Sequence, residues 1–96
     1  MDNKIQLLNV PNQTLTVRIG SVVVNLSLHT HNGILYASTK ADGVRISAGV
    51  RCVPNGRITP RSASRLLGGY LAFRCDDSEY PFYKNFGKSC NLVYEA

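Results

Sequence analysis

The stretch TLTVRIGSVVVNLSLH, residues 14–29, decides the fold of this chain. Apolar residues from Leu15 to Ile19 alternate with polar ones, and after Gly20-Ser21 the alternation resumes from Val22 to Leu28. A period of two is typical of strands that bury one face. Two such runs joined by two residues that begin with glycine predict a tight β-hairpin with a mirror-image turn.

The same pattern continues downstream as a second hairpin. His31-Asn32-Gly33 predicts a turn, residues 34–40 a strand, Ala41-Asp42-Gly43 another turn, and residues 44–53 a longer strand. Gly49, on the polar face of this last strand, predicts a bulge or a close backbone approach. The apolar face is predicted to consist of Val44, Ile46, Ala48, Val50 and Cys52.

The second half of the chain alternates short strands with turns. Residues 54–65, which hold two of the four prolines, predict a loop or a short helical turn, and residues 70–75 and 89–94 predict strands. The chain contains no convincing amphipathic helix and no internal repeat. The prediction is an all-β fold of about seven short strands, closed as a small antiparallel β-barrel or sandwich, in a single domain spanning residues 1–96.

The charge of the chain points to an acidic partner. Eleven basic against six acidic residues give a net charge of +5, and seven of the basic residues are arginine, which suits fixed contacts with carboxylate or phosphate. Charged residues make up 18% of the chain, below the usual share of roughly 25%, so we expect partners or further copies of the chain to cover part of the surface. The alternative is that the charge only keeps a small protein soluble.

Motifs for catalysis or metal binding are missing from the sequence. No serine lies in a nucleophile-elbow motif, and the carboxylates within residues 76–79 fit a solvated turn better than a pair of catalytic acids. His29 and His31 project from one face of a strand, as two metal ligands can, but no third ligand is near, and an exposed strand end is the preferred interpretation. A thiol or metal enzyme would need a spatial cluster that sequence does not show. We therefore expect neither enzymatic activity nor a cofactor.

The cysteines and the start of the chain indicate a cytoplasmic origin. Cys52, Cys75 and Cys90 cannot all pair within one chain, and none is spaced for a zinc or redox motif. Each lies in an apolar stretch, so all three are predicted to be reduced and buried. Met1 to Thr16 lacks the pattern of a signal peptide, and no apolar run is long enough to cross a bilayer, so we expect no membrane contact.

Opposite charges gather in two separate stretches. Residues 51–65 are rich in arginine and contain no acid, whereas residues 76–79 are acidic and precede four aromatic residues around Pro81. One molecule can therefore present its basic loop to the acidic turn of the next, a heterologous contact that closes a ring when it is repeated by rotation. The alternative is that both stretches face water independently. The candidate partner-binding residues are Arg51, Arg57, Arg61, Arg65, Asp76, Asp77, Glu79, Tyr80 and Tyr83.

A series of short motifs runs through the whole chain. They are Val10-Pro11-Asn12-Gln13-Thr14-Leu15, the glycine hairpin, a strand with Tyr36, Gly43-Val44-Arg45, the strand Gly-Gly-Tyr-Leu-Ala-Phe at 68–73, Tyr80-Pro81-Phe82-Tyr83 with Gly87, and Leu92-Val93-Tyr94. In this order the chain resembles the phage baseplate plug family of contractile-tailed bacteriophages. The resemblance implies a structural component of the virion, with a β-barrel of OB-like character, and no catalysis.

This resemblance implies a function and a set of partners. The protein would pack by protein–protein contacts at the junction of baseplate and tail tube, in several copies arranged in a ring, against tube, sheath or hub proteins. It would be located in the virion tail baseplate and assembled in the host cytoplasm, and nucleic acid is not expected as a partner. The competing function is an OB-type single-stranded nucleic-acid-binding protein, which needs a basic groove with solvent-facing aromatic platforms. Phe73 lies in a predicted core strand, which leaves few such platforms.

Overall fold

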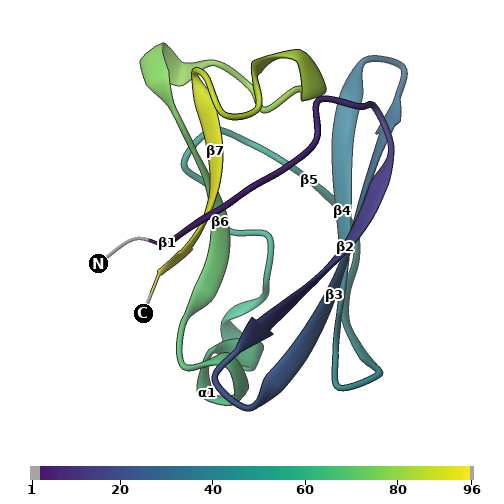
Figure 1. Ribbon diagram of the computed structural model, residues 1–96, viewed down its shortest axis with the longest axis vertical. Coiled ribbons are helices and arrows are strands. Elements are labelled where there is room, and N and C mark those ends of the chain that lie inside the picture. The colour runs from purple at the N-terminus through teal and green to yellow at the C-terminus, as the bar shows by residue number, and fades with distance from the viewer. Residues whose placement is uncertain (1–2, 96) are drawn as a thin grey trace.

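A computed structural model describes residues 3–95, which form two antiparallel sheets around one core (Figure 1). One sheet has the strand order β2-β3-β4-β5, and the other has the order β1-β7-β6. Over the described residues the sheets do not join into a closed barrel, so the all-β prediction is confirmed in its sandwich form. The elements are β1 (Asn3–Ile5), β2 (Gln13–Ile19), β3 (Val22–His31), β4 (Ile34–Ala41), β5 (Val44–Arg51), η1 (Arg61–Ala63), α1 (Ser64–Leu67), β6 (Tyr70–Cys75), η2 (Asp76–Ser78), η3 (Tyr83–Asn85) and β7 (Cys90–Glu95).

The predicted glycine hairpin is formed by β2 and β3. Ile19 pairs with Val22 across the two-residue turn, and Gly20 takes a positive φ of 61°, as the mirror-image turns require. The two turns that flank β4 have positive φ at both central residues, Asn32-Gly33 and Asp42-Gly43, which matches the right-handed twist of the strands they join. All three predicted turns are confirmed.

The face of β5 that packs on the core differs from the prediction. The pairing of β4 with β5 shifts register twice, between Ala37 and Thr39 and again between Thr39 and Lys40, and Gly49 takes a φ of 59°. Each extra residue in a bulge turns the following side chains to the other face of the sheet. The bulge predicted at Gly49 is therefore present. Because of it, the residues before and after Gly49 do not follow one continuous alternation.

Three of the five side chains predicted to face the core from this strand do so. Ile46 and Val50 pack against the core and Cys52 is buried, whereas Val44 is 65% exposed and Ala48 is also exposed. Strict alternation failed here because the sequence pattern contains no signal for a second bulge.

The connection from β5 to β6 covers the outer edge of β6. Cys52 donates a backbone hydrogen bond to Leu35 of β4, and Ile58 donates one to Leu71 of β6. Phe73 of β6 donates in turn to the carbonyl of Gly56. The segment then ends in the short helical turn η1–α1, as predicted for residues 54–65. Consequently β6 is not a free edge.

A disulfide joins Cys75 at the end of β6 to Cys90 at the start of β7. The prediction that all three cysteines are reduced was therefore wrong for this pair, although Cys52 is free and buried as expected. The physical reason is the register of the last hairpin, which places Cys75 directly opposite Cys90. That register arises across a connection of fourteen residues with no strand pattern of its own.

Candidate interaction surfaces

The four candidate arginines do not form one patch. Arg51 lies at the end of β5, apart from the other three, and its guanidinium carbon is 5.1 Å from the centroid of the Tyr80 ring. Tyr80 is 55% exposed, so this cation–π pair is open to solvent on the side of the acidic turn. Two residues that were predicted separately therefore form one contact.

The other three arginines surround the helical turn. The guanidinium of Arg57 lies 3.9 Å from the centroid of the Tyr70 ring and donates to the hydroxyl of Ser64 over 3.5 Å. Arg61 and Arg65 are exposed on η1 and α1. No carboxylate is close enough to form an ion pair with any of these three within residues 3–95. We call Arg57, Arg61 and Arg65 the basic turn.

The predicted acidic turn is built around Ser89. Asp76, Asp77 and Glu79 are all exposed, and the backbone amide of Asp76 donates to the carbonyl of Ser89 over 2.8 Å. The hydroxyl of Ser89 in turn donates to the carboxylate of Glu79. With the disulfide beside them, these bonds fix the backbone of the turn and the carboxylate of Glu79.

The basic turn and the acidic turn lie at opposite ends of β6. In Figure 1 the helical turn labelled α1 is at the bottom of the molecule, and β6 runs from it to the turn that begins at Asp76 at the top. The basic and acidic residues are therefore separated in space as well as in sequence, and they lie at the two ends of the same strand.

The aromatic segment after the acidic turn is mainly part of the core. Pro81 and Phe86 are buried, and the Phe86 ring stacks on Phe73 with 5.8 Å between centroids. Tyr83 is half-buried against the core. Of the two tyrosines predicted to bind partners, only Tyr80 presents most of its side chain to solvent.

One polar network was missed by sequence reasoning. Arg74 pairs with the carboxylate of Glu95 and donates to the hydroxyl of Tyr70 and to the carbonyl of Asn55. The hydrogen bond to Glu95 is the main cause of a raised pKa for Arg74. The sequence offered one signal for this ion pair: a single arginine in β6 and a single carboxylate in β7. Only the correct register of these two strands brings the two side chains together.

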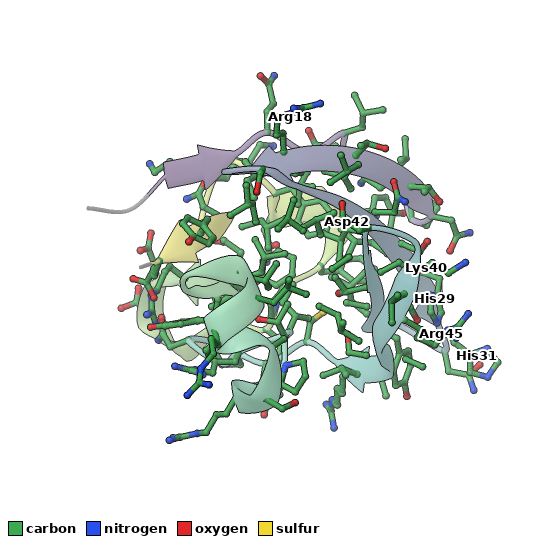
Figure 2. All side chains as sticks on the ribbon, turned by 90° about the horizontal axis from the view of Figure 1, so that it is seen from below. Arg18, His29, His31, Lys40, Asp42 and Arg45 are labelled. Carbon is green, nitrogen blue, oxygen red and sulfur yellow. A yellow bond between two sulfur atoms is a disulfide. The ribbon has the colours of Figure 1, made fainter. Side chains whose placement is uncertain are left out.

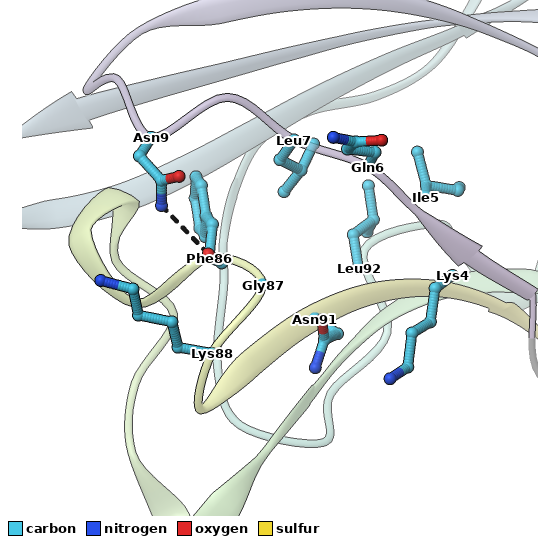
Figure 3. Close-up of a pocket in the computed structure, with 10 residues that line it drawn as sticks. All are labelled: Lys4, Ile5, Gln6, Leu7, Asn9, Phe86, Gly87, Lys88, Asn91 and Leu92. Atoms are coloured by element: carbon cyan, nitrogen blue, oxygen red, sulfur yellow. Dashed lines mark hydrogen bonds between the residues drawn. The ribbon is translucent and has the colours of Figure 1, made fainter.

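Two hollows in the surface lie beside β1. The larger, of about 560 Å³, is shown in Figure 3 between the segment after β1 and the start of β7, with Lys4 and Lys88 on its rim and Phe86 and Leu92 inside it. The dashed bond in the figure joins Asn9 to the carbonyl of Phe86 over 3.0 Å. The second hollow, of about 420 Å³, lies between β1 and β2.

The outer face of the four-stranded sheet is polar and basic (Figure 2). Lys40 and Arg45 pair directly across β4 and β5, and His29 stacks on Tyr36 with 5.9 Å between ring centroids. His29 and His31 are exposed at one strand end. Within the described part of the chain, no three histidine, cysteine or acidic side chains come together as metal ligands would.

The remaining candidate for covalent chemistry is the thiol of Cys52. It is 4% exposed, and burial raises its pKa from 9.0 to about 12. The thiol is therefore protonated at neutral pH, whereas the thiolate is the nucleophilic form.

Exposed turns that fix charged and aromatic side chains, carried on a two-sheet scaffold, are typical of a small β protein that binds other macromolecules. Residues 3–96 match the model of a protein family described as cyanophage baseplate Pam3 plug gp18. The chain belongs to this family of phage baseplate plug proteins, which confirms the resemblance found in its motifs.

Family membership makes the chain a structural component of the virion's tail baseplate and suggests that it is not an enzyme. A search of curated proteins found no match to the chain. Among residues 3–95 there is no helix with the length and hydrophobicity needed to span a membrane.

Proposed function

We propose that this protein packs at the junction of the baseplate and the tail tube of a contractile phage, as several copies that contact one another head to tail. In this arrangement the acidic turn of one molecule meets the basic turn of the next. The observation that carries the proposal is the placement of the two turns at opposite ends of β6. A contact between different surfaces of identical molecules closes into a ring when the rotation between them is suitable.

The side chains on both turns suit such a contact. Arg57 is held over Tyr70, and the acidic turn is fixed by Ser89 and the disulfide, so little conformational freedom would be lost on binding. Tyr80, exposed beside Arg51, adds an aromatic group of the kind enriched at interface centres. The predicted partner-binding residues thus supply charge at both ends and an aromatic anchor at one.

Two charge-reversed variants test the contact. The first carries Asp76→Lys and Asp77→Lys, and the second carries Arg61→Glu and Arg65→Glu, so each has like charges at both ends. We expect light scattering at low salt to show assembly of the natural protein, loss of assembly in each variant alone, and recovery when the variants are mixed. Added salt should reduce assembly because it screens exposed charges.

Asp42→Asn provides the matched control. Asp42 lies in a turn of the other sheet and accepts a hydrogen bond from the amide of Val23 over 3.0 Å, which an asparagine oxygen also accepts. This variant should assemble like the natural protein. Mixed charge-reversed variants that remain monomeric, or single variants that assemble normally, would show that the two turns do not meet.

A second candidate function, the binding of single-stranded nucleic acid, is favoured by the basic outer face of the four-stranded sheet. Tyr36 and His29 form a stacked pair there, on the same sheet face as Lys40 and Arg45, which lie four residues further along β4 and opposite it on β5. Stacking platforms among cationic groups are the usual means of binding single strands. Oligonucleotide affinity that falls linearly with salt on a log–log plot, and that Tyr36→Ala weakens, would support this function.

A further inference from the structure

The core side of the sandwich is incompletely covered where β1 and β2 face each other. Leu15 and Val17 on β2 are half-buried, although their partners Leu26 and Val24 on β3 are completely buried. On the other sheet Ile5 of β1 is also half-buried, and its partner on β7 is 1% exposed. Apolar side chains on the core face of both edge strands therefore remain open to solvent.

The backbone edge of β2 that faces away from β3 is also free to pair with a further strand. In a hairpin with a two-residue turn the residues that flank the turn exchange hydrogen bonds, so the bonded positions of β2 are Ile19, Val17 and Leu15. The amides and carbonyls of Thr14, Thr16 and Arg18 then point away from β3. Among residues 3–95 no strand pairs with β2 on that side, and the edge of β1 that faces away from β7 is likewise unpaired.

The hollow between these two strand edges is apolar inside and basic at its rim. Its volume is about 420 Å³, and its apolar lining comes from both sheets and from the helical turn, including Ile5, Val17, Leu67 and Tyr94. Lys4 and Arg18 are exposed at its rim, and no acidic residue among residues 3–95 lines it. An apolar floor between two unpaired strand edges, with cationic groups outside, fits an extended acidic segment.

We propose that an extended segment of another baseplate protein binds between β1 and β2 as an added strand, with apolar residues alternating with acidic ones. Main-chain hydrogen bonds to Thr14, Thr16 and Arg18 would supply affinity, and alternate side chains would supply specificity. The apolar residues cover Leu15 and Val17, and the acidic residues lie beside Arg18. This inference rests on the proposal that the protein works by protein contacts in the baseplate.

Residues 3–95 of a second copy of this chain do not supply such a segment. Asp42, Asp76, Asp77 and Glu79 lie in turns, and Glu95 already pairs with Arg74. None of these described carboxylates lies in a free extended segment of alternating pattern. The proposal therefore takes a different protein as the occupant.

Thr16→Pro tests the added strand without breaking the hairpin. The amide of Thr16 points away from β3, so proline removes a hydrogen bond to the partner and none from the β2–β3 ladder. Thr16→Val is the matched control, because it also loses the Thr16 hydroxyl bond to Asn25 but keeps the amide. In phage particles assembled with each variant, we expect Thr16→Pro to be depleted about tenfold or more and Thr16→Val to be present at natural levels.

Arg18→Glu provides a second variant in case the proline disturbs folding. It changes one exposed side chain, so circular dichroism of the free protein should be unchanged, while incorporation into particles should fall because the acidic partner is repelled. Incorporation of both Thr16→Pro and Arg18→Glu at natural levels would overturn the proposal.

Hydrogen exchange gives a direct readout on the natural protein. Peptides that cover β2 should exchange more slowly in the particle than in the free protein, whereas peptides that cover β4, a central strand, should change little. Equal exchange of β2 in both states would refute the added strand while leaving the head-to-tail contact untouched. Protection of β2 that rises with concentration in the pure protein would instead identify a second copy as occupant and would also overturn the proposal.

Discussion

Cys75 and Cys90 are joined by a disulfide between residues that face each other directly across β6 and β7. The bond closes a loop with a sequence separation of 15 residues, and that loop contains the whole acidic turn and the aromatic segment. The disulfide therefore limits the freedom of the part of the chain that carries Asp76, Asp77 and Tyr80.

Removal of this disulfide should destabilise the protein. A crosslink that closes a loop of this size contributes about 3 kcal/mol, mainly by restricting the unfolded chain. We expect Cys75→Ala/Cys90→Ala to lower the free energy of unfolding by about 2–4 kcal/mol in denaturant titrations. Reductant should shift the unfolding midpoint of the natural protein and leave that of the double variant unchanged. Three reactive thiols, instead of one, in the unfolded and unreduced natural protein would contradict the pairing.

The register that makes this disulfide marks a limit of sequence analysis. Pairing between β2 and β3 was predictable because a two-residue turn beginning with Gly20 fixes it locally. Pairing between β6 and β7 depends on η2, η3 and the packing of Phe86 on Phe73, none of which has a periodic signal. Local turns were therefore predicted correctly, and contacts across longer connections were not.

Two buried threonines should respond in opposite ways to the same substitution. Thr39 and Thr59 are 0% and 2% exposed, but within residues 3–95 only the hydroxyl of Thr59 has a partner, the amide of Leu71 at 3.1 Å. Thr39→Val removes a buried hydroxyl without a partner and should stabilise the protein by about 1 kcal/mol. Thr59→Val leaves the Leu71 amide unsatisfied and should destabilise it by about 1–3 kcal/mol. Denaturant unfolding measures both, and equal effects of the two substitutions would refute the difference in hydrogen bonding.

The free thiol of Cys52 should make stability depend on pH in alkaline solution. Its pKa is about 12 in the folded protein and 9.0 ordinarily, so above pH 9 the unfolded chain loses a proton that the folded chain keeps. The stabilising contribution is complete below pH 9 and falls by about 1.4 kcal/mol per pH unit between pH 9 and 12. Because tyrosine and lysine also titrate in this range, the measured quantity is the difference in unfolding free energy between the natural protein and Cys52→Ala. A difference that stays constant from pH 8 to 11 would contradict the burial of the thiol.

For the candidate surfaces, sequence analysis predicted the kinds of residue more successfully than their positions in the structure. The acidic stretch of residues 76–79 forms one exposed turn because its members are adjacent in sequence. The arginine stretch divides, since Arg51 ends β5 beside Tyr80 and Arg57 stacks on Tyr70. The uncovered edge of β2 was invisible in the sequence, because an edge strand and a central strand can carry the same alternation.

Two asparagines in the segment between β1 and β2 have opposite hydrogen-bonding roles, so the same substitution to aspartate should affect them differently. Asn9 uses its amide nitrogen to donate to the carbonyls of Tyr83 and Phe86, over 2.8 and 3.0 Å, whereas Asn12 uses its amide oxygen to accept from the backbone of Thr30 over 3.0 Å. Aspartate has the same shape as asparagine and only acceptors. Asn9→Asp therefore loses both bonds and places a charge beside two carbonyls, while Asn12→Asp keeps its bond and strengthens it.

We expect Asn9→Asp to lower the free energy of unfolding by about 1–2 kcal/mol and Asn12→Asp to leave it within about 0.5 kcal/mol. The loss should also be local, because the bonds of Asn9 tie the N-terminal segment to the aromatic segment. Hydrogen exchange in peptides covering residues 80–87 should accelerate in Asn9→Asp and stay unchanged in Asn12→Asp. If both variants behave alike, Asn9 does not hold the aromatic segment, and the position of Tyr80 must depend on its other contacts, which include the bond from the Asn85 amide to its carbonyl and the disulfide of the same loop.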